Sequence, residues 1–138
     1  ALFYAGNFSG WHIINLNTAG VTSVQVAHGR NSGPIGGRVT STSNANGSNK
    51  TTKGFYKVGF KEGRTNKKNL PYLPVQGLES HNRLVGLPPR KGGRDIIIHT
   101  AGYVASGGRS LGCFSIRPQD KRLVFNKLKG VLFYSYVG

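Results

Sequence analysis

The chain has 138 residues, 37% of them hydrophobic, which is enough for one domain with one core and too little for two. We therefore expect a single domain over residues 1–138. Nineteen Lys and Arg face four carboxylates, giving a net charge of +15. So few acidic residues argue against a glycosidase, which needs two carboxyl groups placed across one bond.

The excess of positive charge predicts a polyanionic partner, because a surface of one sign attracts the opposite sign over long range. Nucleic acid, anionic lipid and anionic cell-wall polymers all fit this charge. A basic surface that only keeps the protein in solution stays open as well. No apolar run approaches the roughly 20 residues that a membrane span requires, so we expect no such span.

The first half of the chain predicts a hairpin followed by a long loop. Residues 11–16 and 21–27 are β-branched or aromatic and roughly alternate with polar residues, as in two paired strands. Residues 17–20 would form the turn. Residues 29–53 consist mostly of Gly, Ser, Thr and Asn, which predicts a loop that is the most mobile part of the chain.

The middle of the chain alternates short strands with basic loops. Residues 54–60 predict a strand, and residues 73–78 a short extended segment. Residues 61–69 form a basic loop between them, and residues 84–93 form a second loop with Pro88, Pro89 and two basic residues. We expect the basic residues of these two loops, which are far in sequence from Cys113, to bind an anionic partner.

The last third predicts a buried strand and one helix. The Ile run in residues 94–99 favours a central strand buried on both faces. Residues 118–129 predict a helix with Pro118 in its first turn and an apolar stripe formed by Leu123, Val124 and Leu128. Residues 131–137 predict a closing strand. The fold is therefore expected to be mainly β.

The single cysteine, Cys113, excludes an internal disulfide and is either a small core residue or a reactive thiol. It follows a Gly-rich turn at residues 106–110, fourteen positions after His99 at the end of the buried strand. A cysteine nucleophile requires a base and donors for an oxyanion. His99 could be the base, Gly112 leaves room for such donors, and Arg109 would lower the thiol pKa.

A zinc site is the competing interpretation of these residues. It would combine Cys113 with several of His12, His28, His81 and His99. Neither C-x-x-C nor H-x-x-x-H spacing is present, which argues against it. We expect no metal and no cofactor.

Two segments together resemble the catalytic core of L,D-transpeptidases, in the branch of murein L,D-transpeptidase catalytic domains. They run from Arg94 to Val104 and from Gly108 to Cys113. Four further segments are similar to that branch and follow in the same order, so the resemblance covers roughly residues 11 to 137. These segments are residues 26–33, 53–56, 77–79 and 129–134.

The resemblance implies a single β-rich domain on a mixed sheet or sandwich, with one short helix after the nucleophile. It implies that Cys113 is the nucleophile, that His99 takes its proton, and that the backbone amides of Gly112 and Cys113 stabilise the oxyanion. Arg109, Ser110 and Tyr103 would bind substrate, Arg109 through a substrate carboxylate.

The implied reaction is acyl transfer on peptidoglycan stem peptides, in a periplasmic or secreted location. Cys113 would cleave the bond between the diamino acid and D-Ala, then pass the acyl group to an amine or to water. A catalytically silent wall-binding domain and a basic nucleic-acid-binding module remain alternatives, although no recognition-helix signature for nucleic acid is present. The sequence also departs from many family members, which have Gly, His and Arg where this chain has Thr100, Leu111 and Ser115.

Overall fold

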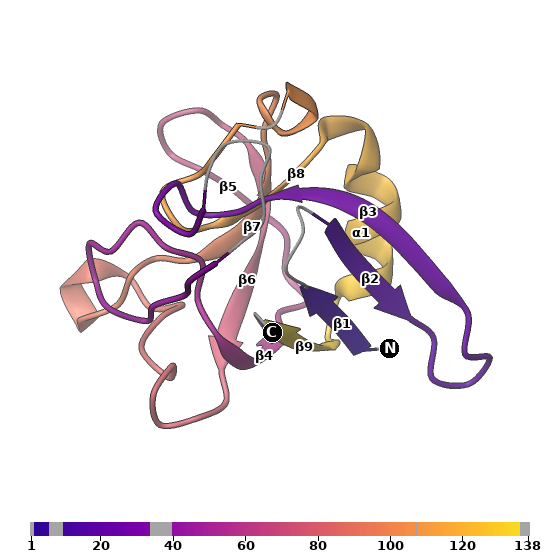
Figure 1. Ribbon diagram of the computed structural model, residues 1–138, viewed down its shortest axis with the longest axis horizontal. Coiled ribbons are helices and arrows are strands. Elements are labelled where there is room, and N and C mark those ends of the chain that lie inside the picture. Colours follow the sequence, from indigo (N-terminus) through magenta and orange to yellow (C-terminus); the bar gives the residue numbers. More distant parts are fainter. Residues whose placement is uncertain (1, 6–9, 34–39, 107, 136–138) are drawn as a thin grey trace.

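The computed structural model describes residues 2–5, 10–33, 40–106 and 108–135. The described residues form nine strands, one α-helix and three 3-10 turns (Figure 1). The strands are β1 (Leu2–Ala5), β2 (Gly10–Ile14), β3 (Val21–Ala27), β4 (Gly54–Val58), β5 (Gly63–Arg64), β6 (Pro71–Gly77), β7 (Ile97–Thr100), β8 (Phe114–Ile116) and β9 (Leu132–Ser135). The turns are η1 (Pro89–Lys91), η2 (Val104–Ser106) and η3 (Pro118–Asp120), and the helix is α1 (Lys121–Leu128).

The strands form one curled, mixed sheet in the order β4-β9-β1-β2-β3-β8-β7-β6-β5. A further pairing between β4 and β6 closes the sheet on itself, since β6 pairs with β7 through its first half and with β4 through its second. The pairs β1–β9 and β7–β8 are parallel, and the others are antiparallel. The expected mainly β fold with a mixed sheet and one short helix is confirmed.

An aromatic cluster fills the space inside the curled sheet. Trp11, Phe114 and Phe133 are fully buried, and their ring centroids lie 4.8 to 5.3 Å apart in tilted and edge-on arrangements, which favour aromatic contacts. These three rings come from β2, β8 and β9. The core therefore fixes β8, the strand that follows Cys113, against β2 and β9.

The predicted helix is present but begins with a tight turn. Pro118 starts η3, and α1 continues from Lys121 to Leu128. The buried residues of α1 are Val124, Phe125 and Leu128. Leu123, which the sequence placed in the apolar stripe, is 40% exposed, because Phe125 takes its place against the core. None of the described helices is long and apolar enough to cross a membrane.

Of the predicted strands, the hairpin is confirmed and the Ile-rich strand is corrected. β2 and β3 pair in antiparallel register from Ile14 and Val21 outward. β7 begins only at Ile97, because Asp95 adopts a left-handed conformation with φ 54° that no strand can contain. Burial on both faces is also wrong, since Ile98 is fully buried but His99 is half-buried on the other face. Residues 34–39 of the long loop, and the last two residues of the strand expected at 131–137, lie outside the described part.

Candidate active site

Cys113 lies directly before β8, at the end of a turn held by Ser110. The buried Ser110 hydroxyl donates to the Cys113 carbonyl at 2.6 Å, and the Gly112 N–H donates to the same hydroxyl at 3.1 Å. Gly112 has φ 124°, and a Cβ there would lie 2.8 Å from Nη2 of Arg94. The turn therefore requires glycine before the cysteine, both for its backbone and for the close guanidinium.

The Cys113 thiol is half-buried and donates a long hydrogen bond, 3.8 Å, to the Asp95 carbonyl. Burial raises the pKa of Cys113, and the charge of Asp95 raises it further. A backbone hydrogen bond from Ile97 and the charge of Arg94 oppose this shift. The cation that lowers the thiol pKa is therefore Arg94, and not Arg109 as the sequence suggested.

His99 lies on β7 opposite Ser115 of β8. Its Nδ1 is 2.9 Å from the Thr100 carbonyl, which can only accept, so we assign the ring proton to Nδ1. The basic nitrogen is then Nε2, which accepts from the Ser115 hydroxyl at 3.3 Å. Burial lowers the pKa of His99, and the charge of Lys68 lowers it further, while the Thr100 bond raises it. His99 is thus kept neutral and able to accept a proton near pH 7.

Tyr103 completes a chain of polar groups beside the thiol. Its hydroxyl lies 2.9 Å from the Ser115 hydroxyl, and Ser115 itself has no exposed surface. Burial raises the pKa of Tyr103, the Ser115 bond lowers it, and the charge of Cys113 raises it. Tyr103 is therefore hydrogen-bonded to Ser115, and the charge of Cys113 acts on its hydroxyl.

The structure brings Cys113 and His99 to one site without a direct contact between them. Among the hydrogen bonds of the described residues, none joins the Cys113 sulfur to His99, and a separation of about 4 Å between them stays a prediction. Cys113 and Ser115 are two positions apart, and alternate residues of a strand point to the same side. Ser115 fills the space into which Nε2 of His99 points.

Arg109 is half-buried in the turn between Gly108 and Ser110, and burial lowers the pKa of its guanidinium. Gly108 packs so closely on the Tyr103 ring that a Cβ there would come within 2.7 Å of it. The turn therefore packs on the Tyr103 ring at the position just before Arg109. Its binding of a substrate carboxylate stays a prediction.

Arg94 is the residue of the site that sequence reasoning missed. Its Nη1 donates to the Ser43 carbonyl at 2.6 Å and its Nη2 to the Lys50 carbonyl at 2.8 Å. One half-buried guanidinium thus ties the long loop to the turn at Gly112 and acts on the Cys113 thiol. No sequence signal marks it, since its partners lie more than forty positions away.

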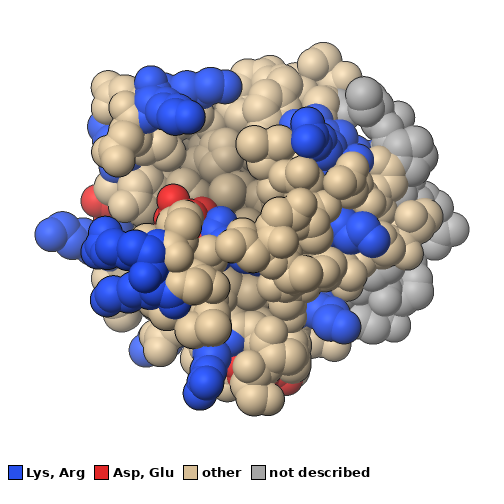
Figure 2. Space-filling view, turned by 90° about the vertical axis from the view of Figure 1, so that its left-hand side faces the viewer, with Lys and Arg blue, Asp and Glu red and all other residues tan. Residues whose placement is uncertain are grey.

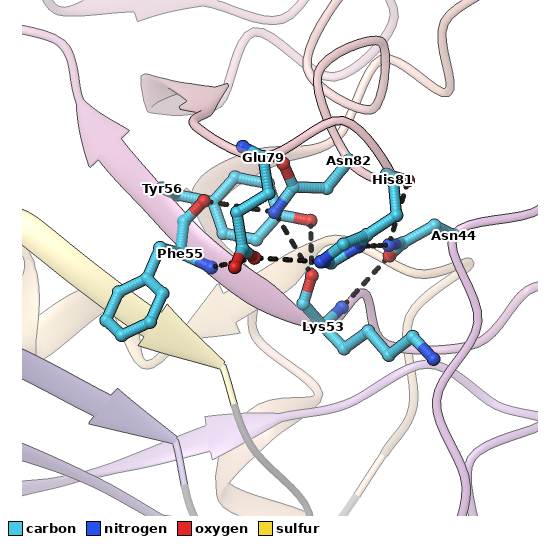
Figure 3. A network of polar contacts seen from close by, with 7 residues as sticks. All are labelled: Asn44, Lys53, Phe55, Tyr56, Glu79, His81 and Asn82. Carbon is cyan, nitrogen blue, oxygen red and sulfur yellow. Dashed lines mark hydrogen bonds and ion pairs between the residues drawn. The ribbon is translucent and has the colours of Figure 1, made fainter.

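Polar contacts hold the described part of the loop expected at residues 29–53, in place of the missing apolar anchors (Figure 3). The Asn44 amide lies 2.8 Å from Nδ1 of His81, whose Nε2 lies 2.8 Å from Glu79. The Asn82 amide donates to the carbonyls of Lys53 and Phe55. The loop therefore forms an anchored wall beside the nucleophile turn, and its mobility stays a prediction.

Lysine and arginine side chains form separate clusters on the face shown in Figure 2, with few acidic residues among them. The basic loop at residues 61–69 is not remote from the site, because Lys68 lowers the pKa of His99. The expectation that this loop serves adsorption more than turnover stays a prediction. Within the described ranges, no three His, Cys, Asp or Glu side chains gather as metal ligands would.

Comparisons with known proteins agree with this geometry. The family model described as L,D-transpeptidase catalytic domain matches residues 6–136. The crystal structure of the helical cell shape determining protein Pgp2 from Campylobacter jejuni is similar to 99% of this chain, with a TM-score of 0.67 and 12% identity, over 47% of its own chain. An L,D-transpeptidase from Xylanimonas cellulosilytica DSM 15894 is similar to 98% of this chain, with a TM-score of 0.55 and 12% identity, over 59% of its own chain.

The chain thus spans about half the length of the solved structures it matches. At such low identity these likenesses concern the fold alone. No curated protein matches the sequence significantly.

Proposed function

Because this chain belongs to the L,D-transpeptidase catalytic domain family, we propose that it is a cysteine acyltransferase that acts on peptidoglycan stem peptides. The observation that carries the proposal is the gathering of a half-buried thiol, a neutral imidazole of fixed tautomer and two linked hydroxyls at the edge between β7 and β8. These are the groups that nucleophilic acyl transfer requires.

In the acylation step, Cys113 attacks the carbonyl between the third, diamino-acid residue and the fourth, D-Ala residue. The thiol proton passes to Nε2 of His99, which carries no proton of its own because Nδ1 holds the ring proton toward Thr100. The C–N bond then breaks, the departing D-Ala amine takes the proton from His99, and a thioester remains on Cys113.

The oxyanion requires backbone donors at the start of β8. In this structure the Gly112 N–H is engaged by the Ser110 hydroxyl, so we assign the main donor to the Cys113 amide. Gly112 then serves the site through its backbone conformation. Ser110 is buried, so its role is to fix the turn before Cys113 through the bond to the Cys113 carbonyl, and not to contact the substrate.

Arg109 and Tyr103 are our candidates for the walls of the substrate site. Arg109 offers a guanidinium that can pair with a substrate carboxylate in two-point geometry. The Tyr103 hydroxyl bonds the Ser115 hydroxyl, two positions after Cys113. Stem peptides carry several carboxylates, which suits a protein with a net charge of +15.

The thioester is resolved by an amine of a second stem peptide, which forms a cross-link, or by water, which trims the stem. The anionic polymers of the wall are the expected surface partners, in the periplasm or outside the cell. Adsorption to them would keep the domain near its substrate.

The proposal is tested by intact-mass analysis after incubation with a carbapenem, a reactive acyl donor. We expect one adduct on the wild type, none on Cys113→Ala and a much slower adduct on His99→Ala. His12→Ala is the matched control, since His12 also bonds a serine hydroxyl but on the β2–β3 hairpin. Its adduct should form at the wild-type rate.

A catalytically silent wall-binding domain is the second candidate, because burial raises the pKa of the Cys113 thiol. An unmodified wild type that still binds purified peptidoglycan would favour it. An unmodified wild type that binds only nucleic acid would overturn both candidates.

A further inference from the structure

A cavity of about 130 Å³ lies between the long loop and the segment that joins β6 to β7. Residues from positions 44–46 line it on one side, and residues from positions 80–94 line it on the other. The contacts from Asn44 to His81, and from His81 to Glu79, tie these two segments together (Figure 3). The two walls of the cavity are therefore held to each other by polar contacts.

The residues that line this cavity suit a small anion with an apolar part. Arg94 is among them, and no acidic residue is among the described lining residues. Ser80 and Asn46 add a hydroxyl and an amide, which can both donate to an oxygen of a ligand. Leu84 and Val85 supply an apolar portion of the wall.

Arg94 keeps hydrogen-bond donors for such a ligand. A guanidinium carries several N–H groups, and only two bonds of Arg94 occur within the described residues, to the carbonyls of Ser43 and Lys50. Both carbonyls are neutral, and none of the ion pairs among the described residues includes Arg94. A half-buried cation of this kind favours a carboxylate, which pairs with a guanidinium through two parallel hydrogen bonds.

The volume of the cavity limits the ligand to about six non-hydrogen atoms. An apolar cavity of about 150 Å³ holds one benzene molecule, whereas drug-sized ligands occupy about 300 Å³ or more. D-alanine is of the smaller size. It offers a carboxylate for Arg94 and a methyl group for the wall formed by Leu84 and Val85.

The cavity adjoins the nucleophile through two pairs of neighbouring residues. A Cβ on Gly112, directly before Cys113, would lie 2.8 Å from Nη2 of Arg94, so this nitrogen is within about 8 Å of Cα of Cys113. Asp95, directly after Arg94, accepts the hydrogen bond of the thiol. One extended residue with a hydrogen bond at its end spans about 6–7 Å. The spacing therefore matches a carbonyl at the sulfur and, one residue further, a carboxylate at Arg94.

Resting on the proposed function, we propose that this cavity binds the terminal D-alanine of the stem peptide and that Arg94 pairs with its carboxylate. The methyl group contacts Leu84 and Val85. When the C–N bond breaks, the residue leaves the cavity as free D-alanine. Arg94 is thus a specificity-determining residue, because it requires a free carboxylate one residue after the cleaved bond.

Titration with free D-alanine, followed by NMR, tests the cavity without any turnover. We expect saturable shifts of the amide signals from residues 44–46 and 80–94. D-alaninamide lacks the carboxylate and should bind about 10-fold or more weakly, since a hydrogen bond to a charged group is lost. Inorganic phosphate, an anion without an apolar part, should also bind more weakly than D-alanine.

Leu84→Glu places a carboxylate of the protein itself in the cavity and should abolish D-alanine binding. The variant leaves Arg94 and its bonds to the long loop in place. Leu84→Gln has nearly the same shape without the charge and should bind D-alanine more tightly than Leu84→Glu. Leu87→Glu is the matched control, because Leu87 is exposed in the same segment and does not line the cavity. It should bind D-alanine as the wild type does.

Two reactions of the wild type connect the cavity to the thiol. The charge of Arg94 lowers the pKa of Cys113, so D-alanine that pairs with Arg94 should slow the alkylation of Cys113 by iodoacetamide at pH 7. D-alaninamide should not slow it. A stem tetrapeptide whose terminal carboxylate is amidated should be cleaved about 10-fold or more slowly than the unmodified peptide.

Three results would overturn the assignment of the cavity. They are equal binding of D-alanine and D-alaninamide, tighter binding of phosphate than of D-alanine, and wild-type binding of D-alanine in Leu84→Glu. If Leu84→Glu does not fold, the comparison of the three ligands on the wild type gives the same decision. A wild type that forms the carbapenem adduct but does not bind D-alanine would refute this inference alone. D-alanine binding without any adduct would refute the proposed function and leave the carboxylate site standing.

Discussion

Replacing Arg94 by glutamine should both destabilise the folded state and lower the fraction of Cys113 that is ionised. The guanidinium donates to the carbonyls of Ser43 and Lys50 at 2.6 and 2.8 Å, and both bonds are lost in the variant. Each hydrogen bond from a charged group is worth about 1.5 kcal/mol or more, so the loss is about 3 kcal/mol. For a domain of this size that lowers Tm by about 10 °C, measured by circular dichroism.

The same variant also removes the positive charge that lowers the pKa of Cys113. Alkylation at pH 7 should therefore slow in Arg94→Gln, because less thiolate is present. Arg90→Gln is the matched control, since Arg90 is an exposed arginine in the neighbouring turn η1. If Arg94→Gln melts within about 2 °C of the wild type and reacts at the same rate, Arg94 neither anchors the loop nor acts on the thiol.

Four further outcomes are expected. Gly112→Ala should cost about 1–3 kcal/mol in chemical denaturation, because alanine is strained at φ 124°; an unchanged midpoint would contradict this. Burial lowers the pKa of His99, so the acid limb of the pH–rate profile should lie below pH 6.5. Lys68→Gln should move this limb to higher pH, because the charge of Lys68 also lowers the pKa of His99, whereas Lys67→Gln should leave the limb in place. The pKa of Cys113 is raised above its ordinary 9.0, so above that pH the folded state binds more protons than the unfolded state. The free energy of unfolding of the wild type should therefore fall as pH rises from about 9, and it should fall less in Cys113→Ala. Binding to purified peptidoglycan should weaken with salt, since the Debye length shrinks from about 10 Å at 0.1 M to about 3 Å at 1 M, while turnover of a small soluble stem peptide should change little.

The elements that the sequence predicts well are those set by local pattern. The β2–β3 hairpin follows from alternation, and the helix after Pro118 follows from its start signal and apolar spacing. β5 and β8 have two and three residues, too few for a periodicity to emerge. The pairing of β4 with β6 that closes the sheet depends on residues about twenty positions apart, which no local pattern reports.

The residues of the candidate site likewise fall into those that local sequence indicates and those that only the folded structure brings together. Cys113 and His99 stand in recognisable motifs, so the sequence points to both. Ser115 acts through a contact formed only when β7 and β8 align, and Arg94 through bonds to carbonyls of the long loop. The charge of Lys68 acts on His99 only because the β5–β6 loop folds back toward it. The left-handed Asp95, which delays the start of β7, is a tertiary effect that overrides the strand propensity of its neighbours.

The central claim is that Cys113 cleaves the bond between the diamino acid and D-Ala. Incubation of a soluble stem tetrapeptide with the wild type, followed by mass spectrometry, tests it most directly. We expect release of D-Ala, a thioester on Cys113 that can be trapped by acid quenching, and neither product in Cys113→Ser. Release of D-Ala by Cys113→Ser at the wild-type rate would contradict it, as would cleavage of the tetrapeptide at any other bond.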